Sequence, residues 1–107
     1  MKHDCVEYID LVDLDGDVVE VCKKHFPWGG AWEDPRVRLH IADGADFVKN
    51  SPNSVYDVII QDSSDPWMVD EKGIKTKLPS CVLYEEAHFR HLHRVLTEIG
   101  VVCVQVI

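Results

Sequence analysis

The stretch DVIIQDSSDP, residues 57–66, decides the fold class of this chain. Its apolar run at 58–60 predicts a strand, and two carboxylates, Asp62 and Asp65, follow that strand three residues apart. Pro66 closes the stretch, and because proline fixes φ and lacks an N–H, it predicts that the strand has ended and a loop begins. An apolar strand that ends in two acids predicts a buried strand that carries reactive groups to the edge of a sheet.

Strand-like and helix-like segments alternate along the rest of the chain. Apolar, β-branched runs predict strands at 8–15, 37–43, 56–62 and 100–107. Helical spacing of apolar residues predicts helices at 18–26, 45–50 and 83–96, and a long loop is expected between 62 and 81. This alternation indicates an α/β fold, a parallel sheet with helices on both faces. Because the strands are apolar runs, we expect both of their faces to be buried.

Carboxylates stand at the ends of three successive predicted strands. Asp13 ends the first strand, Asp43 the second and Asp62 the third. Ligands of open parallel sheets bind beyond the carboxyl ends of the strands, so we expect these acids to share a site at one sheet edge. Asp15 or Asp17 can cap the next helix, and for Asp15, which also follows the first strand, this capping role is expected instead of a place in the site.

Length and composition indicate one small globular domain. The chain has 107 residues, 46% hydrophobic and 28% charged, and no apolar run approaches the roughly 20 residues that a spanning helix needs. The N-terminus, MKHDCVEYID, lacks the apolar core of a signal peptide. A net charge of −8 argues against a nucleic-acid partner, because such proteins carry basic patches. We therefore expect a soluble, cytoplasmic protein without a nucleic-acid or membrane partner.

The spacing of cysteine and histidine does not favour a metal site. The four cysteines are Cys5, Cys22, Cys81 and Cys103. They form no zinc spacing and no tight disulfide framework, so reduced thiols are expected. In HFRHLH, residues 88–93, a helix would bring His88 near His91 while His93 points away. No acidic or cysteine partner stands at ligand spacing, so we expect a partly buried or solvated histidine face and no metal.

Several of these segments together resemble the spermidine synthases and related aminopropyltransferases. They are VDLDGDVVEVCKKHFP, DPRVRLHIADGADFVKN, YDVIIQDSSDP and GVVCVQ, and their order and spacing match from about Val6 to Gln105. DSSDP after a YDVII-like strand, together with the Asp43–Gly44 pair, is a specific signal of that family. The resemblance implies a Rossmann-like parallel sheet of the S-adenosylmethionine methyltransferase type.

The activity that this resemblance implies is spermidine synthase-like transfer of an aminopropyl group from decarboxylated S-adenosylmethionine to putrescine. The products are spermidine and methylthioadenosine, and the donor is a co-substrate of polyamine biosynthesis, so no further cofactor is implied. Asp13 matches the family's acid on the ribose hydroxyls, and Asp43 with Gly44 matches the pair at the adenine. Asp62 matches the catalytic aspartate, in contact with donor and amine, and Asp65 is expected to help hold the amine.

The chemistry of this transfer explains why a carboxylate pair is needed. An alkylammonium with a pKa of roughly 10 is protonated near neutral pH, so it has no lone pair with which to attack a carbon. A carboxylate at the attacking nitrogen can hold the amine and accept its proton. A second carboxylate can share the orientation and the charge of the diamine.

The sequence departs from the family's pattern at three places. It begins inside the helix that follows the family's glycine-rich loop, so the first strand, that loop and the N-terminal β-domain are expected to be missing. The missing strand would lie between those expected at 8–14 and 56–61, leaving two unpaired edges. WMVDEKGIKTKLPSC stands where the family has a shorter loop over the substrates, and the C-terminal helices are expected to be missing. We therefore expect residues 1–107 to be a partial aminopropyltransferase catalytic domain.

Two other classes of function stay open. An S-adenosylmethionine-dependent methyltransferase shares the sheet and the ribose acid, although a methyl acceptor does not generally need two acids. A non-catalytic remnant or regulatory partner of a full-length relative is favoured by the missing glycine-rich loop. Because the full-length family is dimeric, a homo-oligomer is expected, with putrescine and decarboxylated S-adenosylmethionine as small-molecule partners.

Overall fold

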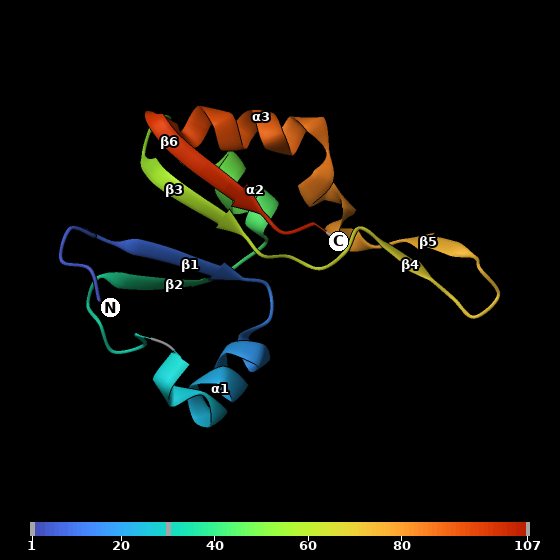
Figure 1. The fold of residues 1–107 in the computed structure, drawn as a ribbon, viewed down its shortest axis with the longest axis horizontal. Coiled ribbons are helices and arrows are strands. Elements are labelled where there is room, and N and C mark those ends of the chain that lie inside the picture. The colour runs from blue at the N-terminus through green and yellow to red at the C-terminus, as the bar shows by residue number, and fades with distance from the viewer. Residues whose placement is uncertain (1, 30, 107) are drawn as a thin grey trace. The chain divides into compact units, whose positions relative to one another are not determined.

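The computed structural model describes residues 2–29 and 31–106, in two compact units that comprise residues 1–44 and 45–107. Its elements (Figure 1) are β1 (Ile9–Asp13), α1 (Gly16–His25), η1 (Pro27–Gly29), β2 (Val37–Ile41), α2 (Gly44–Lys49), β3 (Tyr56–Gln61), β4 (Trp67–Val69), β5 (Lys75–Lys77), η2 (Pro79–Tyr84), α3 (Glu86–Val95) and β6 (Leu96–Val104). Each unit holds one pair of parallel strands. The α/β fold class with parallel strands is therefore confirmed.

The first unit is built on β1 and β2, which pair in parallel with Ile9 opposite Val37 and Asp13 opposite Ile41. Figure 1 shows α1 on one side of this pair. The helix begins at Gly16, two residues before the expected start, and the Asp15 carboxylate accepts a hydrogen bond from the Asp17 N–H of its first turn. The expected capping role of Asp15 is confirmed.

One face of the β1–β2 pair is charged. Asp10 receives hydrogen bonds from Arg38 at 2.7 and 2.9 Å and lies 2.9 Å from His40 Nε2. The Arg38 guanidinium also lies 3.8 Å from the centre of the Tyr8 ring. Asp10 and Arg38 are opposite each other in the strand register, which brings their charges together. The expectation that both faces of this strand pair are apolar and buried is wrong.

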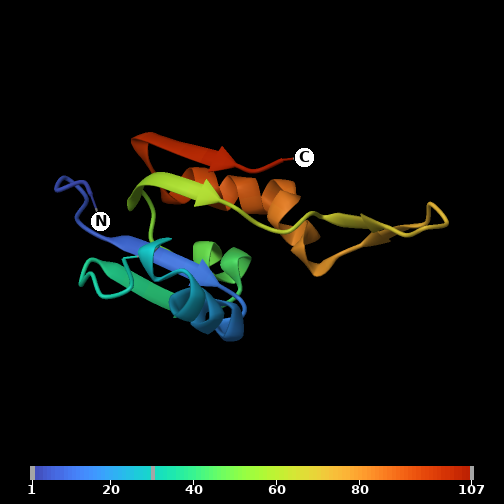
Figure 2. The same cartoon turned by 60° about the horizontal axis from the view of Figure 1, so that its bottom comes forward.

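The second unit is built on β3 and β6, parallel strands with Val58 opposite Val101 and Gln61 opposite Val104. Helix α3 covers one face of this pair (Figure 2) and supplies the core residues Leu92 and Val95, which are 2% and 0% exposed. On the other face Val58 and Ile60 are 59% and 74% exposed. Here too the expectation of two buried faces is wrong, because helix α3 covers only one of the two faces.

The strand β6 begins at Leu96, four residues before the expected start, because the pairing contains a bulge. Leu96 pairs with Tyr56, but the next pair along β3 is Val58 with Val101. Gly100 lies in this bulge, where a Cβ would come within 2.9 Å of Leu96 Cδ2 and 3.1 Å of the Tyr56 carbonyl oxygen. Glycine is required there by the close approach of the two backbones.

No strand bridges the two parallel pairs among the described residues. The sheets are β1–β2, β3–β6 and a separate antiparallel pair, β4–β5. β1 and β3 are therefore not hydrogen-bonded neighbours, as the sequence predicted for the strands at 8–14 and 56–61.

Four free thiols are present, at Cys5, Cys22, Cys81 and Cys103. No helix within 2–29 or 31–106 has the length and apolar character needed to cross a bilayer.

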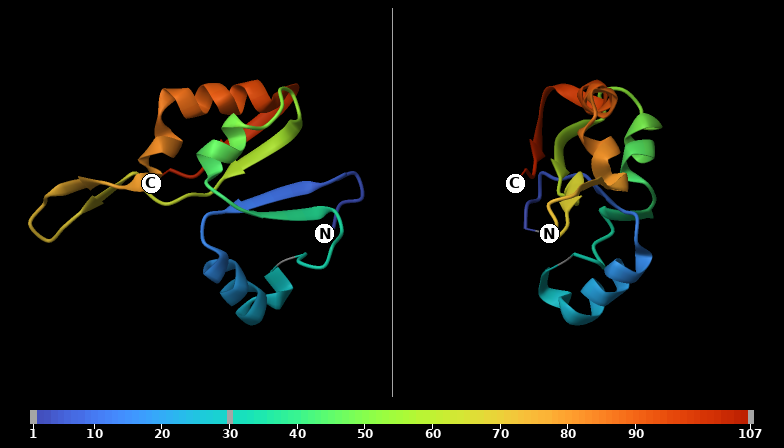
Figure 3. Two further views of the ribbon diagram at one scale, coloured as in Figure 1. Left: turned by 180° about the vertical axis from the view of Figure 1, so that it is seen from behind. Right: turned by 90° about the vertical axis from the view of Figure 1, so that its right-hand side faces the viewer.

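The segment expected to be a loop contains a β-hairpin and a 3-10 helix, so that expectation is wrong. β4 and β5 pair with Trp67 opposite Lys77, and Figure 3 shows the hairpin extending away from β3 and β6. The Asp70 carboxylate closes the turn by accepting the Ile74 N–H at 2.8 Å, and Gly73 adopts a φ of 77°. Strands of three residues each are too short to give a readable alternation.

Candidate active site

The first cluster of predicted site residues lies at the carboxyl edge of β1 and β2. Asp13 is the last residue of β1, and its carbonyl accepts the Ala42 N–H at 3.0 Å, which joins the two strand ends. Its Oδ1 accepts the Asp15 N–H at 2.8 Å. Asp43 is exposed just beyond β2, and Gly44 begins α2. The structure therefore brings Asp13, Asp43 and Gly44 to one strand edge, as expected for them.

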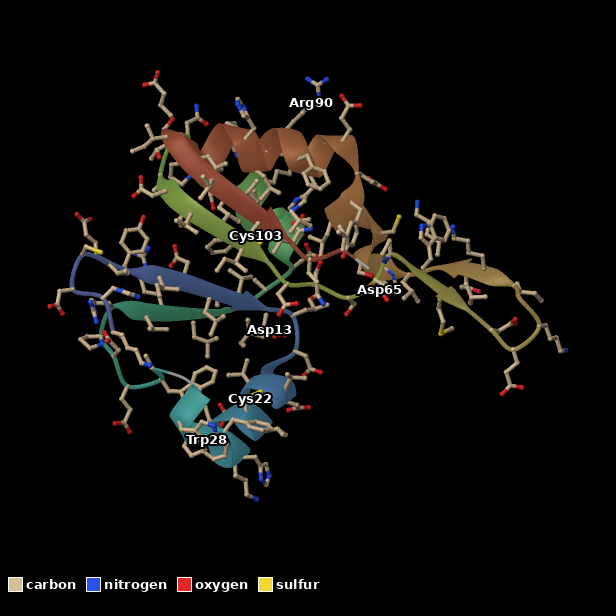
Figure 4. All side chains as sticks on the ribbon, viewed as in Figure 1. Asp13, Cys22, Trp28, Asp65, Arg90 and Cys103 are labelled. Atoms are coloured by element: carbon tan, nitrogen blue, oxygen red, sulfur yellow. The ribbon has the colours of Figure 1, made fainter. Side chains whose placement is uncertain are left out.

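The second cluster follows β3 in the other unit. Asp62 and Asp65 are both exposed, and Figure 4 shows Asp65 near the base of the β4–β5 hairpin. Within residues 2–29 and 31–106, neither carboxylate accepts a hydrogen bond or takes part in an ion pair. Both acids are therefore open to a cationic ligand. Of the three acids predicted to share one edge, Asp13 and Asp43 belong to the first unit, and Asp62 belongs to the second, as does Asp65.

The backbone of the acidic loop, residues 62–66, is held by η2 and the residue before it. Tyr84 Oη donates to the Ser64 carbonyl at 3.1 Å, and Ser80 Oγ donates to the Asp65 carbonyl at 2.6 Å. The Pro66 carbonyl accepts the Leu78 N–H at 2.9 Å. These bonds use carbonyl oxygens and leave the carboxylates available. The loop is thus ordered through its main chain while its charged groups stay exposed.

A buried polar pair ties the end of β3 to α3. Gln61, the residue before Asp62, is 9% exposed, and its Oε1 lies 2.7 Å from Nε2 of His88, which is 5% exposed. Gln61 Nε2 donates to the Leu83 carbonyl at 2.9 Å. Sequence reasoning expected only a histidine face here and missed this pair. One sequence signal could have revealed it. Gln61 is polar but shares a strand face with the apolar Ile59, two residues earlier.

A second anchor holds the turn that leads into β3. Arg94, near the end of α3, donates to the Ser51 carbonyl at 2.8 Å and to Asn53 Oδ1 at 2.6 Å. It also donates to the carbonyls of Val48 and Lys49, both at 3.1 Å. Helix α3 therefore fixes both ends of β3, through Arg94 at the start and His88 at the finish. The strand that carries the acidic loop is well supported within its own unit.

A local ion pair in the first unit, outside the site, joins Asp34 and Arg36. Arg36 holds the pKa of Asp34 well below its usual range, through a side-chain hydrogen bond first and a backbone hydrogen bond second. The side-chain contact measures 2.9 Å between Arg36 Nη2 and Asp34 Oδ2. Arg36 Nη1 also donates to the carbonyls of His3 and Val6, at 3.0 and 3.2 Å, which ties the N-terminal segment to β2.

A second group of titratable side chains lies on α3. An open depression on α3 is lined by Glu86, Phe89, Arg90 and His93, and Glu86 is paired there with Arg90. Figure 4 shows Arg90 on the side of α3 away from Asp65. Across the described residues, no group of three or more His, Cys, Asp or Glu side chains could hold a metal ion. The acids after the strands remain the candidate site.

Parallel strands that alternate with helices place this chain in the class of α/β proteins, in which ligands bind beyond the carboxyl ends of the strands. Within that class this chain belongs to the family of the spermine/spermidine synthase domain, whose model matches residues 1–106. The resemblance carried by DSSDP and by the Asp43–Gly44 pair is thus confirmed for the family, whose members are aminopropyltransferases.

Relatives from plants match almost the whole chain. It is 41% identical over 105 residues to spermidine synthase 2 of Hyoscyamus niger, covering 97% of this chain and 31% of the relative. It is 43% identical over 103 residues to spermine synthase of Arabidopsis thaliana, covering 95% of this chain and 26% of the relative. The chain therefore spans about a third or less of the length of these relatives.

Solved structures of the family have the same fold over the matched part. A spermidine synthase crystallised with the transition-state analogue AdoDATO matches with a TM-score of 0.80 and 33% identity, over 96% of this chain and 32% of that one. Spermidine synthase from Thermotoga maritima matches with a TM-score of 0.72 and 29% identity, over 96% and 31% of the two chains. The arrangement of strands and helices described above is thus that of spermidine synthases.

Proposed function

We propose that residues 1–107 form part of a catalytic domain that transfers an aminopropyl group from decarboxylated S-adenosylmethionine to putrescine. The products would be spermidine and methylthioadenosine, as in polyamine biosynthesis, with no additional cofactor. Membership in the spermine/spermidine synthase family supports this reaction class. The observation that carries the proposal is the acidic loop, in which Asp62 and Asp65 keep exposed carboxylates on a main chain fixed by hydrogen bonds.

In the proposed reaction Asp62 is the base. Its carboxylate takes a proton from the ammonium of putrescine, and the freed nitrogen lone pair attacks the aminopropyl carbon bonded to sulfur. A C–N bond forms as the C–S bond breaks, and the bonding electrons return to sulfur, which becomes the neutral thioether of methylthioadenosine. Asp65 holds the other positive charge of the diamine, because two carboxylates suit two ammonium groups.

The donor nucleoside is assigned to the first unit. A carboxylate accepts two hydrogen bonds at once, which suits the vicinal ribose hydroxyls at Asp13, and Asp43 accepts from the exocyclic amine of adenine. Gly44 lets the backbone approach the base because it has no Cβ. Asp13 Oδ1 already accepts the Asp15 N–H, so the ribose would be bound through Oδ2 and the remaining lone pair of Oδ1.

The test is direct measurement of methylthioadenosine release by the full chain, meaning the complete catalytic domain that contains residues 1–107, supplied with decarboxylated S-adenosylmethionine and putrescine. The expected result is release that needs both substrates and is lost in Asp62→Asn. S-adenosylmethionine in place of the decarboxylated donor is the control for a methyltransferase, and it should give no methylated product. Methyl transfer, or donor consumption that Asp62→Asn does not change, contradicts the proposal.

A second candidate is a regulatory subunit that binds a full-length relative. The apolar residues Val58 and Ile60 on the uncovered face of β3 favour it, at 59% and 74% exposure. Mixing the chain with spermidine synthase and measuring both the mass of the complex and the turnover separates the two candidates. An inactive chain that forms a stable hetero-complex supports the regulatory role, and an active homo-oligomer supports the enzyme.

The remaining proposals concern partners and place. We propose a homo-oligomer that acts in the cytoplasm on small-molecule substrates, without a nucleic-acid or membrane partner. The net charge of −8 supports the exclusion of nucleic acid, because phosphates would be repelled. Sedimentation of the full chain at several concentrations tests the oligomeric state.

A further inference from the structure

Gln61 and His88 form a buried polar pair at the end of the strand that carries the acidic loop. Gln61 closes β3, immediately before Asp62, and His88 lies near the start of α3. Burying polar side chains costs stability unless their hydrogen bonds are made. Their 2.7 Å contact offsets part of that cost but does not by itself favour the pair over two apolar residues of similar size.

The pair has only one arrangement of donors and acceptors. The Leu83 carbonyl can only accept, so the amide nitrogen of Gln61, 2.9 Å away, must face it. The amide oxygen of Gln61 then faces His88, and Nε2 of His88 must carry the proton that it donates. The carbonyl of Leu83 thereby fixes the orientation of Gln61 and the proton position on His88.

This arrangement fixes the strand end from two directions. The main-chain carbonyl of Gln61 accepts the Gln105 N–H at 3.0 Å, and its side chain is bound to α3 and η2. Successive residues of a strand point to opposite sides. With Gln61 held inward and buried, the next residue, Asp62, points outward and is exposed. The direction of the Asp62 carboxylate thus depends on what holds Gln61.

We propose that Gln61 and His88 are positioning residues for Asp62, and that their buried hydrogen bond sets the direction in which this carboxylate meets the amine. The inference rests on the proposed function and adds two residues that act through Asp62. A displacement of about 1 Å at a reacting group can lower turnover about 100-fold, so a link of this kind affects rate without touching the substrate.

The experiment compares four variants of the full chain, each assayed under conditions in which urea unfolding shows it to be folded. His88→Phe and Gln61→Leu should each lower kcat for aminopropyl transfer by about 10- to 100-fold, with the affinity for methylthioadenosine unchanged. His88→Gln keeps a donor and should recover most of the turnover. His93→Phe, an exposed position on the same helix, is the matched control and should leave kcat unchanged.

The double variant separates positioning from packing. Gln61→Leu alone leaves both His88 Nε2 and the Leu83 carbonyl without their bonds to Gln61, whereas Gln61→Leu/His88→Phe leaves only the Leu83 carbonyl so. The double variant should therefore be more stable than Gln61→Leu. If the pair positions Asp62, kcat stays low in that variant. Recovery of both stability and kcat, or a kcat for His88→Phe equal to that of the wild type, overturns the inference.

A readout that needs no turnover keeps the inference apart from the proposed function. In ¹⁵N NMR of the full chain, the imidazole of His88 should carry its proton on Nε2, and His88→Phe should shift or broaden the amide signals of 62–65. A wild-type chain without transfer activity contradicts the proposed function, and these signals then decide the inference alone. Unchanged amide signals at 62–65 in His88→Phe overturn it.

Discussion

Asp13 and Asp62 occupy equivalent places, each at the carboxyl end of a parallel strand, but their carboxylates are used differently. Asp13 Oδ1 accepts the N–H of Asp15, two residues along, and so takes part in the turn that leads into α1. Asp62 is exposed. The direction of its carboxylate is set by Gln61, whose side chain is bound to η2 and α3, and by the main chain of the acidic loop, which is bound to η2. One acid is fixed by its local turn, and the other is left open for a ligand by contacts made around it.

The largest expected effect comes from the open acid. Asp62→Asn keeps the shape and an acceptor oxygen but removes the base, so turnover with putrescine should fall about 100- to 10,000-fold. Binding of methylthioadenosine, measured by calorimetry, should change little, because Asp62 is assigned mainly to the amine. Near-normal turnover in Asp62→Asn would show that the open acid is not the catalytic group.

The second acid of the loop should affect affinity more than rate. Asp65→Asn removes one charged partner of the diamine, and a hydrogen bond to a charged group contributes about 1.5–3 kcal/mol, so KM for putrescine should rise about 10- to 100-fold. Glu71→Gln, an exposed acid in the hairpin turn, is the control for general charge effects. Equal changes in KM for the two variants would remove Asp65 from the amine site.

The acids of the first unit should act on the nucleoside alone. Asp43→Ala should weaken methylthioadenosine binding about 2- to 10-fold, the size expected for one hydrogen bond, and Asp43→Asn, which keeps an acceptor oxygen, should weaken it less. The calorimetric Kd tests this. Equal affinities for the wild type and Asp43→Ala would leave the nucleoside to other residues.

The smallest expected effect concerns acid stability of the first unit. Arg36 lowers the pKa of Asp34, so the folded state binds that proton less readily than the unfolded state, whose carboxyl has a pKa of about 3.9. The resulting stabilisation is present above that pKa and is lost as pH falls through the lower folded value. Asp34→Asn should therefore slightly lower the free energy of unfolding at pH 7. In urea unfolding at a series of acidic pH values, this free energy should change less with pH than it does in the wild type. An unchanged acid dependence would show that the pair contributes nothing measurable.

The sequence was most informative where the cause is local. Three predicted features depend only on residues close to each other in the chain, and all three are present in the structure. They are the alternation of strands and helices, the cap at Asp15 and the acids at strand ends. Expectations failed where more distant parts of the chain decide. Neither β1 nor β3 has both of its faces buried, because burial depends on what packs against a strand. The strands of the hairpin are too short to show a hydrophobic period in the sequence.

The four longer strands, the acids that follow three of them and the family motif DSSDP were predicted from the sequence alone, because hydrophobic period and terminal residues are properties of neighbouring positions. Only the tertiary structure decided how the acidic loop is held. Its bonds join residues far apart in the chain, 20 positions between Tyr84 and Ser64 and 27 between His88 and Gln61. The bulge at Gly100 likewise depends on the backbone of Tyr56 across the strand pair. Such contacts form only when folding brings distant segments together, so no local sequence pattern predicts them.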